Sequence, residues 1–349
     1  MNPTQVSAAT RTRAAVAWRW TKRIAIGAAA LLVVVPLAGL AYQSVASALD
    51  ARRFPPPGRL VDVGGHRLHV HTQGDASPTV VLDAGLSGCS LSWSLVQPEV
   101  ARFARVCAYD RAGHGWSDPA ESPRTSLQIA RELRTLLTNV RIPGPYVLVG
   151  HSFGGFNVRV FASEYPLDVA GLVLVDASLE SERVPASVSR AVSALREQAR
   201  AARVLSWFGI VRAFFIEPNA MLPASARDAE MAVNSRTRYL DTVVSEWDLM
   251  ETESVAQVRS RPSLPPVPIV VLAAERSMAK PLPGVSQADT DRANLWSRED
   301  QAAFAHRYPT ALHIAVDSSH EIPQDQPAAV VDAIRKVVEA VRENRPLRR

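Results

Sequence analysis

The sequence of 349 residues contains only two cysteines, Cys89 and Cys107. Two cysteines without a CxxC spacing indicate neither a disulfide framework nor a structural zinc site. The chain also lacks internal repeats, and with 47% hydrophobic and 21% charged residues it is neither disordered nor collagen-like. We therefore expect buried free thiols in a folded chain that is long enough for a full-sized core.

The chain has no excess of positive charge beyond its first residues. The formal net charge is +5, and five basic residues precede residue 24 without any acidic neighbour: Arg11, Arg13, Arg19, Lys22 and Arg23. The rest of the chain is neutral, with 34 acidic residues balanced by the same number of basic ones. Nucleic-acid binding requires a basic surface, so we expect no nucleic-acid partner.

An uncharged run of 19 residues, 24–42, follows the basic cluster. As a helix it would be about 28 Å long at about 1.5 Å per residue, which is close to the thickness of a bilayer's hydrocarbon core. Trp18 and Trp20 precede the run, and the basic flank should stay in the cytoplasm. We expect a basic cytoplasmic segment over 1–23 and a single transmembrane helix or signal anchor over 24–42, with the rest of the chain extracytoplasmic.

A cleavable signal peptide is the alternative interpretation of this N-terminus. Small residues at 46–48 have the spacing that signal peptidase requires, and cleavage there would give a secreted protein. The apolar run is longer than the core of about 7–15 residues in most signal peptides, which favours an uncleaved anchor. We expect residues 43–58, which include the run Phe-Pro-Pro-Pro-Gly, to form a stiff linker before a domain over 59–349.

Short apolar runs alternate with helical patterns after residue 59. Residues 59–63 and 67–71 flank Gly64-Gly65 and predict a β-hairpin. Further strand-like runs lie at 79–83, 105–109, 146–150, 171–176, 267–272 and 312–316. This alternation predicts an α/β protein with a mostly parallel central sheet flanked by helices. Residues 179–262 contain no strand-like run and predict a helical insertion between the sixth and seventh strands.

The segment Gly150-His151-Ser152-Phe153-Gly154 lies directly between a predicted strand and a predicted helix. A GxSxG sequence in this context is a nucleophile elbow, in which the glycines permit a sharp turn that exposes the serine at the edge of the sheet. A serine hydroxyl needs a nearby base and a third group that orients the base. Ser152 is therefore the candidate nucleophile.

Three motifs in this order resemble those of the α/β-hydrolase superfamily: the elbow at 150–155, Asp110-Arg-Ala-Gly-His-Gly-Trp-Ser117 and Ser318-Ser-His320. The resemblance covers residues 59–344 and implies the α/β-hydrolase fold, with the insertion over 179–262 as a helical cap. It also implies His320 as the catalytic base of a serine carboxylesterase or lipase-like enzyme. Such an enzyme hydrolyses a small-molecule acyl substrate through an acyl-enzyme and requires no cofactor and no metal.

The acid of the triad is the point at which the sequence departs from the commoner family pattern. Many family members carry an aspartate after strand seven, where this chain has Ala273-Ala-Glu-Arg-Ser277. Asp176, at the end of strand six, is our candidate acid, and Glu275 is the alternative. The family's oxyanion hole implies the backbone amides of Leu86 and Phe153 as its donors.

Two other functions are compatible with the sequence. A proline-iminopeptidase-like aminopeptidase would need acidic cap residues to bind an α-amine, and four candidates lie in the insertion: Glu246, Asp248, Glu251 and Glu253. A catalytically inactive hydrolase fold used for binding is the second alternative. The sequence does not indicate the natural substrate or the oligomeric state.

Overall fold

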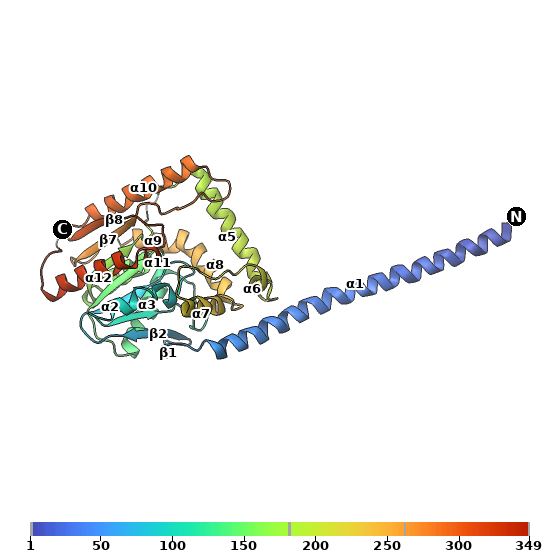
Figure 1. The fold of residues 1–349 in the computed structure, drawn as a ribbon, viewed down its shortest axis with the longest axis horizontal. Coiled ribbons are helices and arrows are strands. Elements are labelled where there is room, and N and C mark those ends of the chain that lie inside the picture. Colours follow the sequence, from blue (N-terminus) through green and yellow to red (C-terminus); the bar gives the residue numbers. More distant parts are fainter. Residues whose placement is uncertain (1–2, 181–182, 262, 348–349) are drawn as a thin grey trace.

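The computed structural model describes residues 3–180, 183–261 and 263–347 (Figure 1). Its centre is an eight-stranded sheet with the order β1-β2-β4-β3-β5-β6-β7-β8. The strands are β1 (Arg59–Asp62), β2 (Arg67–Gln73), β3 (Thr79–Asp83), β4 (Val106–Tyr109), β5 (Tyr146–His151), β6 (Val169–Val175), β7 (Ile269–Ala274) and β8 (Ala311–Val316). Only the pairings of β2 with β1 and with β4 are antiparallel among these strands, which confirms the predicted hairpin and the mostly parallel sheet.

Helices cover both faces of the sheet because successive strand residues point to opposite sides. Val81 and Leu148 pack on the side of α3 (Ser126–Asn139) and α4 (Gly154–Glu164), where the end of α10 (Gln287–His306) also packs. Their neighbours Val80 and Val147 pack on the side of α12 (Pro327–Arg342). Short helices complete the domain: η1 (Ser90–Trp93), α2 (Gln97–Val100), η2 (Pro166–Asp168) and α11 (Ile322–Asp325).

The predicted helical insertion leaves the sheet after β6 and returns before β7. It contains α5 (Ala186–Ser206), α6 (Ile210–Phe214), α7 (Ala224–Asn234), α8 (Tyr239–Leu249), η3 (Met250–Ser254) and α9 (Val255–Arg259). No strand interrupts the described residues of this insertion, which we call the cap. After the cap and β7, α10 begins at Gln287, where the Ser286 side chain accepts a hydrogen bond from the Asp289 amide at 3.1 Å.

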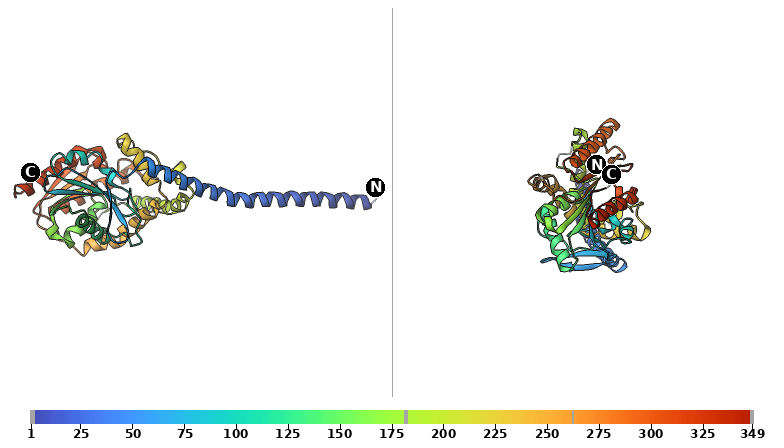
Figure 2. Two further views of the ribbon diagram at one scale, coloured as in Figure 1. Left: turned by 90° about the horizontal axis from the view of Figure 1, so that it is seen from below. Right: turned by 90° about the vertical axis from the view of Figure 1, so that its left-hand side faces the viewer.

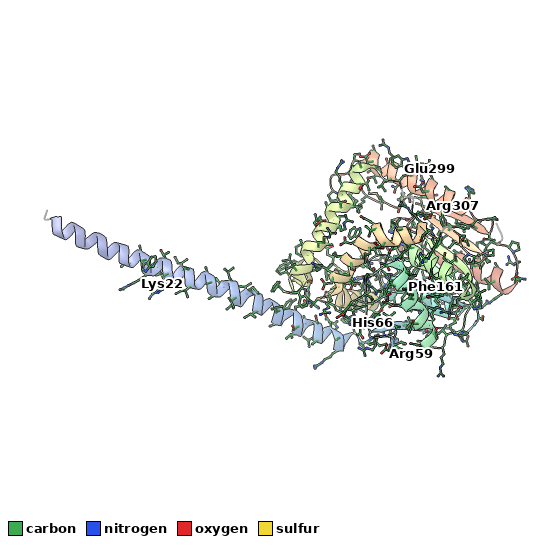
Figure 3. The ribbon with its side chains drawn as sticks, turned by 180° about the vertical axis from the view of Figure 1, so that it is seen from behind. Lys22, Arg59, His66, Phe161, Glu299 and Arg307 are labelled. Carbon is green, nitrogen blue, oxygen red and sulfur yellow. The ribbon has the colours of Figure 1, made fainter. Side chains whose placement is uncertain are left out.

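The N-terminal helix α1 (Pro3–Arg53) projects from the domain as a long rod (Figures 1 and 2). Lys22, just before the uncharged run, lies far from the domain in Figure 3. Among the helices of the described residues, α1 is the one whose length and apolar composition are sufficient to cross a membrane. The expectation of a linker over 43–58 is wrong for residues 43–53, which continue α1 because no glycine or proline interrupts the chain between Gly39 and Phe54.

Both cysteines are free and buried. Burial raises the pKa of the Cys89 thiol well above its usual value and that of Cys107 to about 11. Thiols that stay protonated and buried are poor nucleophiles, which agrees with the expectation that they only fill space in the core.

Candidate active site

Ser152 occupies the sharp turn between β5 and α4. Its φ of 50° lies in the left-handed region, which is strained for a residue with a side chain. A side chain at Gly150 would overlap the Gly154 carbonyl, and one at Gly154 would overlap the Asp83 carbonyl, so both positions require glycine. The Ser152 amide donates to the Val175 carbonyl at 3.1 Å, which secures the strained residue against β6. This is the strained turn that the GxSxG segment predicts.

His320 and Asp176, which are 144 positions apart in the chain, form a hydrogen-bonded pair. The distance from His320 Nδ1 to Asp176 Oδ2 is 2.7 Å, and the Asp176 side chain is only 2% exposed. Asp176 also accepts hydrogen bonds from Ser277 Oγ at 2.6 Å and from the Ala274 amide at 3.1 Å. Burial opposes ionisation of Asp176, but the bond to His320 and its charge outweigh burial and lower the pKa of Asp176. A charged carboxylate held against His320 Nδ1 can orient the imidazole for proton transfer.

The alternative acid, Glu275, follows β7. Its backbone amide donates to the Val316 carbonyl at 2.9 Å and its carbonyl accepts a bond from Arg298, so its backbone belongs to the β7–β8 edge. Ser277, where family members commonly carry the acid, donates to Asp176 instead. The geometry therefore favours Asp176 over Glu275 as the partner of His320.

The loop after β3 lies against the elbow. A Cβ atom at Gly85 would be 3.0 Å from His151 Nδ1 and 3.2 Å from Ser152 Cβ, so this glycine permits the close approach. Within the described residues, neither the Leu86 amide nor the Phe153 amide donates to a protein acceptor. An oxyanion hole requires unused N–H donors of this kind, here from two segments that meet at the elbow.

His151, which directly precedes the nucleophile, contacts both the backbone and the ring of the base. Its Nε2 donates to the His320 carbonyl at 2.9 Å, and the centres of the two rings are 4.8 Å apart. Burial, together with the neighbouring His320, lowers the pKa of His151, so that it stays neutral near pH 7. The ligand atoms of Glu321 and the two histidines lie within 4.8 Å of one another. Because one nitrogen of each imidazole is already hydrogen-bonded, we assign these histidines to hydrogen bonding.

Comparison with known sequences agrees with this geometry. The sequence model described as "Alpha/beta hydrolase family" matches residues 80–333. The chain belongs to the α/β-hydrolase family. The hydrolase is 20% identical over 332 residues to the uncharacterized protein YbdG of Bacillus subtilis, covering 92% of this chain and 98% of that protein. It spans 15% to 47% of the length of three other curated relatives.

Solved structures give the same fold. An esterase from Thermogutta terrifontis is 21% identical, with a TM-score of 0.59 over 81% of the hydrolase and 99% of the esterase chain. The epoxide hydrolase CorEH is 16% identical, with a TM-score of 0.60 over 81% of the hydrolase and 98% of its own chain. These similarities confirm the α/β-hydrolase fold that the resemblance implied.

Arg111 is a residue of this hydrolase whose importance the sequence analysis missed. It is 2% exposed and donates to the Ala84 carbonyl at 2.7 Å and the Gly85 carbonyl at 2.8 Å. It also pairs with Asp83 at 2.9 Å and with both carboxylate oxygens of Glu246 on α8, at 2.8 and 2.9 Å. One buried guanidinium therefore joins the loop that contains Leu86 to the cap.

The acidic cap residues considered for amine binding are mostly engaged in ion pairs. Glu246 is buried against Arg111, and burial opposes its ionisation, but the Arg111 charge and His114 hold its pKa far below the usual range. Asp248 pairs with Arg200 at 2.6 Å, and Glu251 pairs with Arg196. Three of the four candidate carboxylates are thus neutralised by arginines of this chain.

Glu230 on α7 is a titratable cap residue that the sequence analysis did not single out. Burial and the neighbouring charge of Glu321 raise its pKa to about 7. In the unfolded chain the same carboxyl ionises near 4.5, so the native state holds a proton between these values and loses stability as the pH rises. Glu321 directly follows His320, which places this pair of carboxyls near the site.

The Glu230→Gln variant is therefore expected to be more stable than the wild type by about 3 kcal/mol at pH 8. At pH 4, where Glu230 is protonated in both states, the two proteins should unfold alike. Thermal unfolding of the full chain in detergent at both pH values measures the difference. Equal stability at pH 8 would show that Glu230 ionises normally.

Proposed function

We propose that the hydrolase cleaves a carboxylic ester or a related acyl bond through an acyl-enzyme on Ser152. The observation that carries this proposal is the hydrogen bond of 2.7 Å between His320 Nδ1 and the buried Asp176. It supplies an oriented base in a fold whose elbow presents Ser152. The similar solved structures include an esterase and an enol-lactonase, both of which agree with acyl chemistry.

In the proposed mechanism, Ser152 Oγ attacks the acyl carbonyl while His320 Nε2 accepts the hydroxyl proton. Asp176 stabilises the imidazolium through Nδ1–H, and the amides of Leu86 and Phe153 donate to the developing oxyanion. His320 then gives the proton to the leaving alcohol, which departs and leaves the acyl group on Ser152. Water attacks this ester with His320 again as base, releasing the carboxylic acid and restoring the hydroxyl.

Two competing functions receive less support from the site. Epoxide opening through a covalent ester needs a carboxylate nucleophile, and the elbow of this chain carries Ser152. Recognition of an α-amine needs an available carboxylate, but Glu246, Asp248 and Glu251 are paired with arginines. We therefore favour acyl-ester hydrolysis over both.

Labelling with a fluorophosphonate probe tests the proposed function. The wild type should be labelled covalently, and the Ser152→Ala and His320→Ala variants should lose labelling because the serine is then absent or not activated. Cys89→Ser is the matched control and should be labelled like the wild type, since that thiol only packs in the core. An unlabelled wild type that is folded by circular dichroism would contradict the proposal and favour a binding protein.

We also propose that α1 anchors the hydrolase in a membrane as a single, uncleaved span, with the catalytic domain on the extracytoplasmic side. Gln43 is 2% exposed and donates to the Ser235 carbonyl of the cap at 2.7 Å. Cleavage after Ala48 would remove Gln43 and leave that part of the cap uncovered. We expect N-terminal sequencing of the membrane fraction to give the start of the chain. A mature protein that begins at Leu49 would contradict the anchor and indicate secretion.

A further inference from the structure

The end of the cap carries an exposed apolar surface, which we call the cap tip and define as residues 204–215. Phe214 is 78% exposed and Phe215 is 66% exposed. Large apolar side chains that are exposed together in this way mark interaction surfaces. The other large apolar side chains exposed in the tip are Val204, Leu205 and Trp207. The tip contains a single charged residue, Arg212, which pairs with Asp50 of α1. Its outer surface is therefore both apolar and uncharged.

The cap tip packs against α1 at the end of the uncharged run. Gly39 lies against Phe208, and Gly209 lies against Tyr42, so closely that a Cβ atom at either glycine would overlap its neighbour. The Arg212 side chain donates to Gln43 Oε1 at 3.1 Å. The yellow-green end of the cap and the lower part of α1 lie side by side in Figures 1 and 2. The level of the tip along α1 is thus defined by direct contacts.

The length of the uncharged run determines where this level lies relative to a bilayer. Residues 24–42 make about 28 Å of helix, barely enough for a hydrocarbon core of about 30 Å. The whole run is therefore needed to cross the hydrocarbon. The residues that contact the cap, from Gly39 to Tyr42, form the last turn of this run. Side chains of residues 16–35 are exposed along the rest of the helix, as a lipid-facing span requires. A tip that is level with residues 39–42 lies at the boundary of the bilayer.

We propose that the cap tip inserts into the interfacial layer of the membrane that α1 crosses, with Trp207, Phe214 and Phe215 as its anchors. Aromatic side chains favour this layer, and an uncharged surface enters it without desolvating a charge. The occupant of the exposed surface is the lipid bilayer itself. The consequence for catalysis rests on the proposed function: the acyl substrate is a lipid-soluble ester that reaches the site from the membrane.

Depth measurement tests the position of the tip without using catalysis. A fluorescent label at Phe214→Cys in the full chain, in vesicles of phosphatidylcholine and phosphatidylglycerol, should be quenched by lipids that carry a nitroxide near the headgroup. The matched control is Leu167→Cys, which is 93% exposed at the end of the strands away from the cap and should be quenched by aqueous iodide instead. Native Cys89 and Cys107 are buried and should stay unlabelled. Equal quenching of both labels by iodide would overturn the proposal, whether or not the protein is an esterase.

Activity then tests the consequence for the substrate. The double variant Phe214→Asp/Phe215→Asp should lose at least tenfold in kcat/KM for a long-chain ester dissolved in the same vesicles, because charges hold the tip out of the interface. Its kcat/KM for a water-soluble acetate ester should stay within twofold of the wild type. Leu167→Asp should leave both values unchanged. Equal losses on the two esters would overturn the membrane route to the site. A wild type that hydrolyses neither ester would contradict the proposed function instead.

Discussion

The Asp176→Asn variant is expected to lower kcat by about 10⁴-fold, because an amide cannot hold the His320 tautomer that accepts the Ser152 proton. The pair at 2.7 Å both orients the imidazole and stabilises its charged form. Because asparagine is nearly isosteric and the Ser277 hydroxyl remains as a neighbour, the fold should be retained. Single-turnover kinetics with an activated ester, together with thermal unfolding, separate the catalytic effect from a structural one.

Glu275→Gln is the matched control for this variant. It also converts a carboxylate to an amide on the same edge of the sheet, and we expect kcat within about twofold of the wild type, since Glu275 takes part mainly through its backbone. A large loss in Glu275→Gln with an active Asp176→Asn would transfer the role of the acid to Glu275. Equal, small effects in both variants would remove the acid from the mechanism.

The Arg111→Met variant is expected to lower the free energy of unfolding by about 3–5 kcal/mol, because it leaves buried carboxylates without their cation. Glu246 and Asp83 are both fully buried and both accept from this guanidinium. The loop that contains Leu86 should also lose its support, since Arg111 holds the carbonyls of Ala84 and Gly85. We therefore expect kcat to fall further than the loss of stability explains. Urea unfolding of the full chain in detergent and kcat below the transition measure the two effects.

Arg67→Met provides the control for an arginine–carboxylate pair at the surface. Arg67 lies 2.7 Å from Asp118, but its side chain is 54% exposed, so its loss should barely change the free energy of unfolding. A combined Arg111→Met/Glu246→Leu variant should regain part of the stability, because one buried charge is then removed with its partner. If Arg111→Met were as mild as Arg67→Met, the buried cluster would not couple the cap to the loop.

Local patterns in the sequence were sufficient to predict the sheet and the elbow. Short runs with an apolar centre, such as Val80-Val81-Leu82 within 79–83, fit best in a buried strand, and the two glycines around Ser152 are needed for one particular turn. The pairing of Asp176 with His320 was predictable in part, because both follow strands whose carboxyl ends share one edge of the sheet. The sequence could not decide between Asp176 and Glu275, since both follow strands at that edge.

Long-range contacts carried no comparable signal. Arg111 and Glu246 are 135 positions apart, and nothing around either residue indicates that they meet in the core. The continuation of α1 to Arg53 was missed for a different reason. The proline run at 55–57 suggested a linker, but its effect begins only at Phe54, and the preceding residues are good helix formers that pack on the cap through Gln43.

The unbroken passage of α1 from the uncharged run to the cap has a mechanical consequence. Between Gly39 and Arg53 the helix contains neither proline nor glycine, and it is bonded to the cap through Gln43 and Asp50. A rigid connection of this kind transmits the tilt of the span to the catalytic domain, whereas a loose tether would absorb it. Helices tilt when bilayer thickness and apolar length differ. For the membrane anchor proposed above, the thickness of the bilayer therefore becomes one of the variables that set how the catalytic domain is oriented relative to the lipid.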